Sequence, residues 1–363
     1  MIIFMHNEVM TTIFDVAKLA NVSIKTVSRA YNEPKKLKKE TLLRVKKAIK
    51  KLHYIPHRGA QIMRSNKSGL CGLITDAIST DDGPFQSGLS SLGIVQGVQH
   101  SLKQYNKTVL MADTNNDPEE ISKLIRSFST HKVEGIIIST SKHIKIKKIN
   151  LKMNIPIVLV NCYSDNEFPS ILPDDYEAQK SITQKMIQSS HRNIAMVGLN
   201  NNSSAGKLRK KAFIDTCIKF GLNKSEFNYV PGVKNYYGKF KSNDHLVIEE
   251  ALEKILSIKT LPSAICFGND MMAMKALPIM EKKGIKVPRD ISIWGFDNDT
   301  AVCNFSHPTL STISLPYYEM GLEAGHALLH QINKNTKPFL NKLICGKIVF
   351  RQSSLQNIKR QIA

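Results

Sequence analysis

The sequence lacks the long hydrophobic segment that a membrane-spanning helix requires. No run of about 18 apolar residues occurs in the chain. Its first ten residues, MIIFMHNEVM, hold no basic segment followed by a long apolar one, and a secretory signal peptide needs both. We therefore expect a cytoplasmic protein with no transmembrane helix and no membrane partner.

Paired cysteines are also missing. The six cysteines are scattered, none forms a C-x-x-C pair, and most lie in or beside apolar stretches. This pattern predicts buried free thiols in a reducing compartment rather than a disulfide framework. They are Cys71, Cys162, Cys217, Cys266, Cys303 and Cys345.

Motifs for nucleotide or hydrolytic chemistry are absent too. There is no G-x-x-x-x-G-K-[ST], no G-x-S-x-G and no dinucleotide fingerprint after a strand. His326 and His330 lie one helical turn apart, but Ala327 stands where a zinc protease needs glutamate, so a histidine pair on a helix face is the better interpretation. Asp297 and Asp299 lack the glycine and glutamate of a calcium loop. We predict no enzyme, no catalytic residue, no metal site and no cofactor.

Basic residues, by contrast, are abundant and unevenly distributed. The net charge is +21. Residues 1–68 hold 15 Lys or Arg and 4 Asp or Glu, a net +11, whereas residues 69–363 hold 36 and 26, a net +10. A strongly basic N-terminal segment, followed by a longer part with a lower density of positive charge, is typical of nucleic-acid-binding proteins.

Two short helices are predicted near the N-terminus. Thr12 and Asp15 form a T-x-x-D capping box for the first, which should end at Asn21, a residue type that tolerates a left-handed turn. Ser23 should cap the second helix, Ile24 to Tyr31, with Val27 and Ala30 facing inward.

A third helix is predicted from Glu40 to Leu52. Its apolar side chains repeat at three- and four-residue spacing, while basic residues fill its other faces. Two short helices joined by a tight turn and followed by a basic third helix indicate a helix-turn-helix. The alternative is a small helical cap with a solvated basic face.

The N-terminal residues resemble those of the lactose/galactose-repressor (LacI/GalR) family. The stretch TTIFDVAKLANVSIKTVSRAYNEP, followed by ETLLRVKKAIKKLHYIPHRGAQIMR, carries this resemblance through V-S-x-x-T-V-S-R and Y-x-P-x-R. It implies that the second helix enters the major groove of DNA. Lys25 could then donate to guanine and Ile24 pack on a thymine methyl, while Thr26 and Ser28 contact phosphate or pack. The implied DNA-binding residues are Ser23, Ile24, Lys25, Thr26, Ser28, Arg29, Arg58 and Met63.

Several residues depart from the family pattern. Lys38 replaces the usual serine cap of the third helix, and His53 replaces a glycine after it. Gly59 enters the hinge helix, where glycine costs about 1 kcal/mol relative to alanine, so this helix should order weakly without DNA. Met63 stands where relatives place a leucine that wedges into the minor groove. Because the first nine residues precede the usual family start, Met10 could be the initiator.

Past residue 69 apolar strands alternate with amphipathic helices, which predicts βαβ units and two parallel sheets. The predicted strands are Leu70–Thr75, Thr108–Ala112, Gly135–Ser139, Pro156–Val160, Ile194–Gly198, Ala264–Phe267 and Ile291–Gly295. The predicted helices include Ile94–Tyr105, Pro118–Thr130, Ala178–Ser189 and Met271–Lys283. A ligand would bind at the carboxyl ends of the strands.

This part of the chain resembles the family's sensing domain, which is similar to a periplasmic sugar-binding protein. The matching segments are DPEEISKLIRSF, HKVEGIIIST, KLRKKAF, CFGNDMMAMKAL, GIKVPRDISIWGFDN and LSTISLPYYEMG, so the resemblance runs from about Thr11 to Gln352. It implies an N-terminal all-α helix-turn-helix domain plus an α/β two-lobed domain with parallel sheets. The implied domains are a segment 1–10, a DNA-binding domain 11–57, a hinge 58–68, an effector-binding and dimerisation domain 69–353 and a tail 354–363.

Two charged residues match the family's effector contacts, Arg209 in KLRKKAF and Asp297 in WGFDN. A guanidinium and a carboxylate in one cleft can bridge adjacent sugar hydroxyls. The alternatives are a surface ion pair for Arg209 and a residue that caps its own turn for Asp297. Asn161 and Asn269, at strand ends, match further polar contacts. An aromatic stacking on the ligand could be Phe85, Tyr236 or Tyr237, unless these only pack in the core.

The ligand itself is constrained only in part. Purine-sensing relatives place an arginine where this chain has Ser203, which disfavours a nucleobase effector. Leu315 stands where many sugar-responsive members have glutamine, and the segment Asp81–Gly88 is longer than usual. Both departures fall at the cleft mouth in relatives, so the effector's identity does not transfer.

Together these features predict a homodimeric, sequence-specific transcriptional regulator with a pseudo-palindromic DNA operator. A small-molecule effector, expected to be a carbohydrate, would control its operator affinity. The C-terminus is too short for a tetramerising heptad tail. The rival interpretations are a periplasmic-type solute-binding protein, which the basic N-terminal segment contradicts, and a sugar-metabolising enzyme, which lacks a nucleophile or metal constellation.

Overall fold

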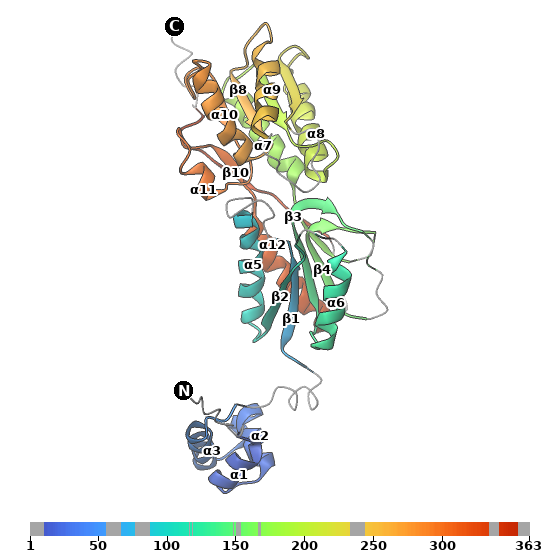
Figure 1. Cartoon of the computed structure of the whole chain (residues 1–363), viewed down its shortest axis with the longest axis vertical. Coiled ribbons are helices and arrows are strands. Elements are labelled where there is room, and N and C mark those ends of the chain that lie inside the picture. Colours follow the sequence, from blue (N-terminus) through green and yellow to red (C-terminus); the bar gives the residue numbers. More distant parts are fainter. Residues whose placement is uncertain are drawn as a thin grey trace, which may run out of the picture. The chain divides into compact units, whose positions relative to one another are not determined.

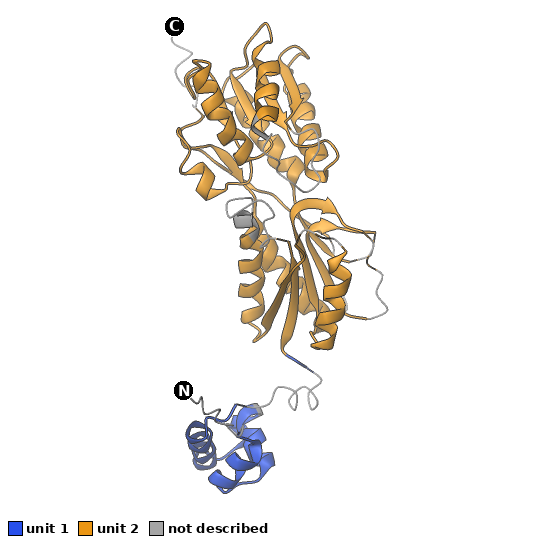
Figure 2. Ribbon diagram, viewed as in Figure 1, with its two compact units in different colours: residues 1–68 blue, residues 69–363 orange. Residues whose placement is uncertain are grey.

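The computed structural model describes residues 11–55, 67–76, 88–115, 117, 119–147, 149, 154–165, 168–232, 244–333 and 341–354. The chain divides into two compact units, residues 1–68 and 69–363 (Figure 2). Among the described helices, none is long and apolar enough to cross a membrane.

The first unit is a small helical bundle. It consists of α1 (Ile13–Ala20), α2 (Ile24–Asn32), a 3-10 turn η1 (Pro34–Lys36) and α3 (Lys39–Lys51). These helices bury a compact apolar core made of Val16, Ala17, Ala20, Val27, Ala30, Val45 and Ala48. The predicted three-helix arrangement is therefore confirmed, with boundaries that differ by one residue.

Local capping explains where these helices begin and end. The Thr12 hydroxyl accepts a hydrogen bond from the Asp15 amide, and the Asp15 carboxylate accepts one from the Thr12 amide, so the capping box is present. Asn21 ends α1 at φ 51°, in the left-handed region. Lys38 provides no side-chain cap for α3, as its residue type predicts.

The second unit contains two parallel sheets, each with helices on both faces (Figure 1). The sheet of lobe 1 has the strand order β11-β5-β4-β3-β1-β2, and all its pairings are parallel. Its strands are β1 (Leu70–Thr75), β2 (Thr108–Asp113), β3 (Ile136–Lys145), β4 (Ile157–Tyr163), β5 (Ser170–Pro173) and β11 (Lys342–Ile344).

Three helices cover the sheet of lobe 1. Helices α5 (Gly88–Lys103) and α12 (Tyr317–Ile332) pack on one face, against side chains such as Leu73 and Val160. Helix α6 (Glu120–Thr130) packs on the other, against side chains such as Ile74 and Ile138. Because α12 follows the four strands of the parallel sheet of lobe 2, the polypeptide must return from lobe 2 to complete lobe 1.

Lobe 2 is built in the same way. Its parallel sheet has the order β7-β6-β8-β9, with α7 and α8 on one face and α9 and α10 on the other. The strands of this sheet are β6 (Ile194–Gly198), β7 (Phe227–Pro231), β8 (Ala264–Phe267) and β9 (Ser292–Trp294). A separate antiparallel pair is formed by β10 (Thr312–Ser314) and β12 (Lys347–Val349). The helices are α7 (Asp175–Gln188), α8 (Ser204–Lys219), α9 (Asp244–Leu256), α10 (Asp270–Lys282) and α11 (Thr300–Cys303).

The prediction of two parallel sheets is confirmed, and two strand lengths need correction. β3 continues to Lys145 and β4 to Tyr163, beyond the predicted ends at Ser139 and Val160. Beyond a register shift after Ser139 the two strands pair again, Ile144 with Cys162. The residues between these pairs, 140–143, are polar and lack the apolar pattern used for the prediction.

Candidate functional site

The second helix of the first unit presents an exposed polar face. Ser23 caps α2 by accepting a hydrogen bond from the Thr26 amide at 3.2 Å, and the two hydroxyl oxygens lie 2.9 Å apart. Val27 and Ala30 turn inward, as predicted. Ile24, which is 37% exposed, therefore lies on the outer side of the helix with Lys25 and Arg29.

The other predicted DNA contacts fall into two groups. Thr26 and Ser28 are half-buried on α2, and this burial suits packing or phosphate contact better than contact with base edges. Arg58 and Met63, with Gly59 of the expected hinge helix, lie outside the described residues.

Arg209 is the centre of a buried polar cluster in lobe 2. It lies on α8, is 4% exposed, and its Nε donates to Asp175 Oδ1 at 2.7 Å. Its Nη1 donates to the carbonyl oxygen of Gly268 at 2.6 Å. The guanidinium carbon lies 3.5 Å from the ring centre of Phe296. Arg209 therefore forms a buried ion pair, not the surface ion pair that was its alternative.

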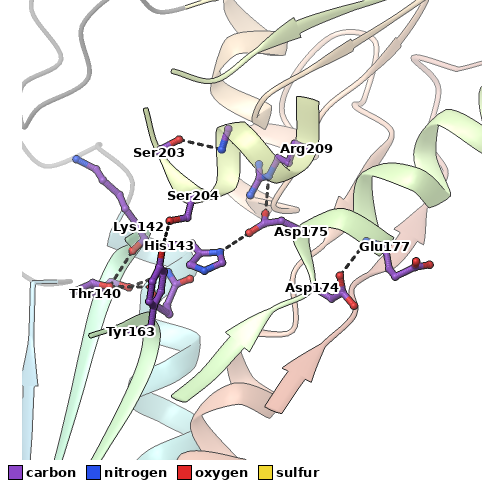
Figure 3. A network of polar contacts seen from close by, with 12 residues as sticks. Thr140, Lys142, His143, Tyr163, Asp174, Asp175, Glu177, Ser203, Ser204 and Arg209 are labelled. Atoms are coloured by element: carbon purple, nitrogen blue, oxygen red, sulfur yellow. Dashed lines mark hydrogen bonds and ion pairs between the residues drawn. The ribbon is translucent and has the colours of Figure 1, made fainter. Parts of the chain in front are cut away.

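Asp175 joins this cluster to lobe 1. It lies in the first turn of α7, and its second oxygen, Oδ2, is 2.7 Å from Nδ1 of His143 on β3 (Figure 3). Burial would raise the pKa of this carboxyl, but Arg209 and His143 outweigh it, so the pKa lies below its usual value. The carboxylate is ionised and shared by two partners.

A second contact joins the lobes beside the first. The Tyr163 hydroxyl, at the end of β4, lies 3.0 Å from the Ser204 hydroxyl at the start of α8 (Figure 3). The rings of Tyr163 and His143 meet edge to face, with centres 5.9 Å apart. Two side chains of lobe 1 therefore contact the first turns of two helices of lobe 2.

Asp297 follows β9 and approaches Arg209 without bonding to it. Its Oδ1 is 3.7 Å from Arg209 Nη2, beyond hydrogen-bond distance. No described residue donates a hydrogen bond to its carboxylate in this structure, so it does not cap its own turn. Burial, together with the nearby carboxyls of Asp270 and Asp175, raises the pKa of Asp297 to about 8 despite Arg209.

The backbone at Asp297 is strained. Its φ is 109°, which non-glycine residues adopt only when the surrounding structure imposes it. The amide of Asp297 donates to Ile313 at 2.9 Å, and its carbonyl accepts from Leu315 at 3.4 Å. These bonds to the chain around β10 hold the carboxylate in place.

The two predicted asparagines already have protein partners. Asn161 on β4, at φ 57°, donates from its amide to the carbonyl oxygen of Thr140 at 2.9 Å. Asn269 caps α10 by accepting from the amide of Met272 at 2.8 Å. Both lie at the carboxyl ends of parallel strands, where a ligand is expected. Phe85, Tyr236 and Tyr237 lie outside the described residues.

Two residues singled out for ligand selectivity have local roles here. Ser203 caps α8 through the amide of Gly206 at 2.9 Å. Leu315 is buried in the core of lobe 2. Of the paired histidines on α12, His326 is exposed, and within the described residues no group of three or more His, Cys, Asp or Glu could hold a metal ion.

His143, Asp175 and Phe296 join the cluster although the sequence did not single them out. Asp175 lies two residues after the short strand β5, and Phe296 lies two residues after β9, so their positions near strand ends could have indicated them. His143 gave no such signal, because it lies in a polar segment beyond the predicted end of its strand.

Comparisons with known proteins agree with this architecture. Residues 12–57 match the family model "Bacterial regulatory proteins, lacI family", and residues 72–351 match "Periplasmic binding proteins and sugar binding domain of LacI family". The chain is 28% identical over 349 residues to catabolite control protein A of Priestia megaterium, covering 94% of this chain and 99% of that protein.

Two further proteins are similar over most of the chain. The HTH-type transcriptional repressor PurR of Pasteurella multocida is 29% identical over 332 residues, covering 90% of this chain and 94% of that protein. The lac repressor dimer bound to operator and the anti-inducer ONPF has a similar fold, with a TM-score of 0.73 at 22% identity, covering 95% of this chain and 99% of that chain. The chain therefore belongs to the LacI family of DNA-binding transcriptional regulators, which are not enzymes, and carries that family's effector-binding domain.

Proposed function

We propose that this protein is a repressor that binds a pseudo-palindromic operator as a homodimer and changes its operator affinity when a small carbohydrate binds between the lobes. The observation that carries this proposal is the meeting of Arg209, Asp175 and Asp297 with His143 from the opposite lobe. A ligand bound there would contact both lobes, so its binding could alter their relative orientation.

The position of the cluster supports a ligand site. Gly268 and Asp297 follow β8 and β9, and Tyr163 ends β4, so carboxyl ends of parallel strands from both sheets meet at this junction. Ligands of α/β proteins bind at such ends. Charged groups and hydroxyls in a mostly apolar surrounding suit a polyhydroxylated ligand.

The first unit supports operator binding. One exposed α2 per subunit of a two-fold dimer would read two half-sites, which predicts the pseudo-palindrome. We expect Ile24, Lys25 and Arg29 to approach base edges, and the basic residues of α3 to add sequence-independent attraction to phosphates.

The test begins with selection of duplex DNA from a random pool by the purified full-length protein. We expect a selected sequence with two inverted half-sites and one dimer bound, measured by sedimentation. Affinity for this duplex should fall by roughly 10³–10⁵ between 50 and 200 mM salt if about 6–10 phosphates are contacted. A half-site without a repeat, or a flat salt dependence, would contradict the proposed binding mode.

Effector control is tested on the same duplex by fluorescence anisotropy in the presence of a panel of sugars. We expect at least one sugar to change operator affinity in the parent and not in Arg209→Ala. Lys219→Ala, at the far end of the same helix, is the matched control and should respond as the parent does. An equal response in Arg209→Ala and the parent would show that the ligand binds elsewhere.

A further inference from the structure

We propose that the effector is an amino sugar whose protonated amine is bound by the Asp297 carboxylate. This inference rests on the proposed function, because it names the chemical class of the ligand that would bind at the lobe junction.

The charge of Arg209 is already balanced by the protein. Its Nε donates to Asp175 at 2.7 Å and its Nη1 to the carbonyl of Gly268 at 2.6 Å, while Phe296 lies against the guanidinium at 3.5 Å. Asp175 is fully buried and completes its bonding with His143. The positive charge of Arg209 is therefore already neutralised by the protein and does not require an anionic ligand.

Asp297 is the carboxylate with the weakest pairing among the described residues of this cluster, because its ion pair with Arg209 is long. It lies 3.7 Å from Arg209 Nη2, accepts no hydrogen bond from the described residues, and its side chain keeps 24% of its surface accessible. Its backbone is held at φ 109° by two hydrogen bonds to the chain around β10. The backbone of Asp297 is therefore fixed, and its carboxylate is partly accessible.

The other charged groups increase the negative potential there. Asp270 is buried and accepts hydrogen bonds from the Thr312 hydroxyl at 2.6 Å and the Asp299 amide at 2.7 Å. Asp299 caps α11 by accepting from Ala301 at 3.0 Å. Lobe 1 adds Asp76 and Lys142, whose opposite charges interact with each other. Four carboxyl groups, those of Asp175, Asp270, Asp297 and Asp299, thus lie around the single guanidinium of Arg209.

An ammonium group compensates this excess better than a hydroxyl does. Both can donate to the carboxylate, but only the ammonium adds a positive charge, and charge-assisted hydrogen bonds are about twice as strong as neutral ones. Burial is the largest cause of the raised pKa of Asp297, and the carboxyls of Asp270, Asp175 and Asp299 raise it further. A bound ammonium would lower this pKa and hold Asp297 in its ionised form. The hydroxyls of Tyr163 and Ser204 nearby suit the neutral hydroxyls of the rest of a sugar.

The experiment compares matched sugars by titration calorimetry on the full-length protein in phosphate buffer, because Tris itself carries an amine. The probes are D-glucosamine, D-galactosamine and D-mannosamine, each beside its neutral parent sugar and its N-acetyl form. We expect one amine to bind about 10- to 100-fold more tightly than both of its matched neutral forms. Asp297→Asn should lose this preference, whereas Glu281→Gln, at an exposed carboxylate on α10, should keep it.

The outcomes separate this inference from the proposed function. Neutral sugars that bind as tightly as their amines, no binding of any amine, or a preference that persists in Asp297→Asn would each overturn the amine assignment. If a neutral sugar alone binds and alters operator affinity, the proposed function stands without the inference. If an amine binds with the expected preference and operator affinity does not change, the inference stands and effector control fails.

Discussion

The imidazole Nδ1 of His143 lies 2.7 Å from Oδ2 of Asp175, and this contact joins a strand of lobe 1 to a helix of lobe 2. Both side chains are buried. Because an ionised carboxylate can only accept, Nδ1 carries the hydrogen. The other oxygen of Asp175 holds Arg209 at 2.7 Å, so a residue of lobe 1 helps to orient the arginine of lobe 2.

Removing the imidazole should therefore weaken both the fold and the ligand site. In His143→Ala one buried oxygen of Asp175 loses its donor, and we expect a loss of about 1–3 kcal/mol in the free energy of unfolding. Urea unfolding measures this loss. His330→Ala, on α12, is the control and should unfold as the parent does. Equal stability of both variants would show that the contact contributes nothing.

Asp175 should make the protein sensitive to acid. Its pKa is lowered in the folded state, so its ion pairs stabilise the fold fully above the unfolded pKa near 3.8. This contribution is lost as the pH falls through the lowered folded value. Asp175→Asn should therefore be less stable than the parent at pH 6, and the two should converge below pH 4. A constant difference across this range, measured by urea unfolding, would argue against the shift.

Asp297 should have the opposite effect, because its pKa is raised to about 8. Its protonated form stabilises the fold fully below the unfolded value near 3.8, and that contribution is lost as the pH rises through about 8. In the absence of ligand, Asp297→Asn should exceed the parent by about 0.5–2 kcal/mol at pH 9 and lose this advantage near pH 4. Thermal unfolding at the two pH values tests this, with Glu281→Gln on the exposed face of α10 as the control.

Lys25 should contribute to sequence recognition. It is exposed near the start of α2, where a lysine can donate to guanine. We expect Lys25→Ala to cost about 1–3 kcal/mol on the selected operator and little on random DNA. Lys47→Ala, on the exposed face of α3, should weaken both to the same extent. If Lys25→Ala also weakens both equally, Lys25 contacts phosphate rather than a base.

Gly321 should be intolerant of any side chain. Helices α5 and α12 approach so closely that a Cβ at Gly321 would overlap the carbonyl oxygen of Ile94. Separating two packed helices costs about 1–3 kcal/mol, so Gly321→Ala should lower the thermal midpoint by several degrees. Glu323→Ala, two residues along α12, is the control. An unchanged midpoint in Gly321→Ala would mean that the helices move apart freely.

The helical unit was predictable in detail because its signals are local. Thr12 and Asp15 are three residues apart, Ser23 bonds to the amide of Thr26, and Asn21 turns the chain between two helices. Each contact closes within one helical turn, so residue type and spacing are enough to place it. The parallel strands β1 to β4, β6, β8 and β9 followed from their apolar runs, because each run must be buried between helices. Strands β5, β7 and β11 were not predicted.

The cluster at the lobe junction was predictable only in part. A motif resemblance indicated Arg209 and Asp297, whereas His143 and Asp175 carried no comparable pattern. These two residues are 32 positions apart in the sequence. They meet because lobe 1, which carries β3, packs here against α7 of lobe 2. Hydrogen bonds between such side chains depend on the packing of both sheets, and no short-range preference encodes that packing. The sequence by itself determined which residue types can carry charge. The tertiary structure decided that Arg209 donates to Asp175 at 2.7 Å and lies 3.7 Å from Asp297, because the packing of both sheets sets these distances.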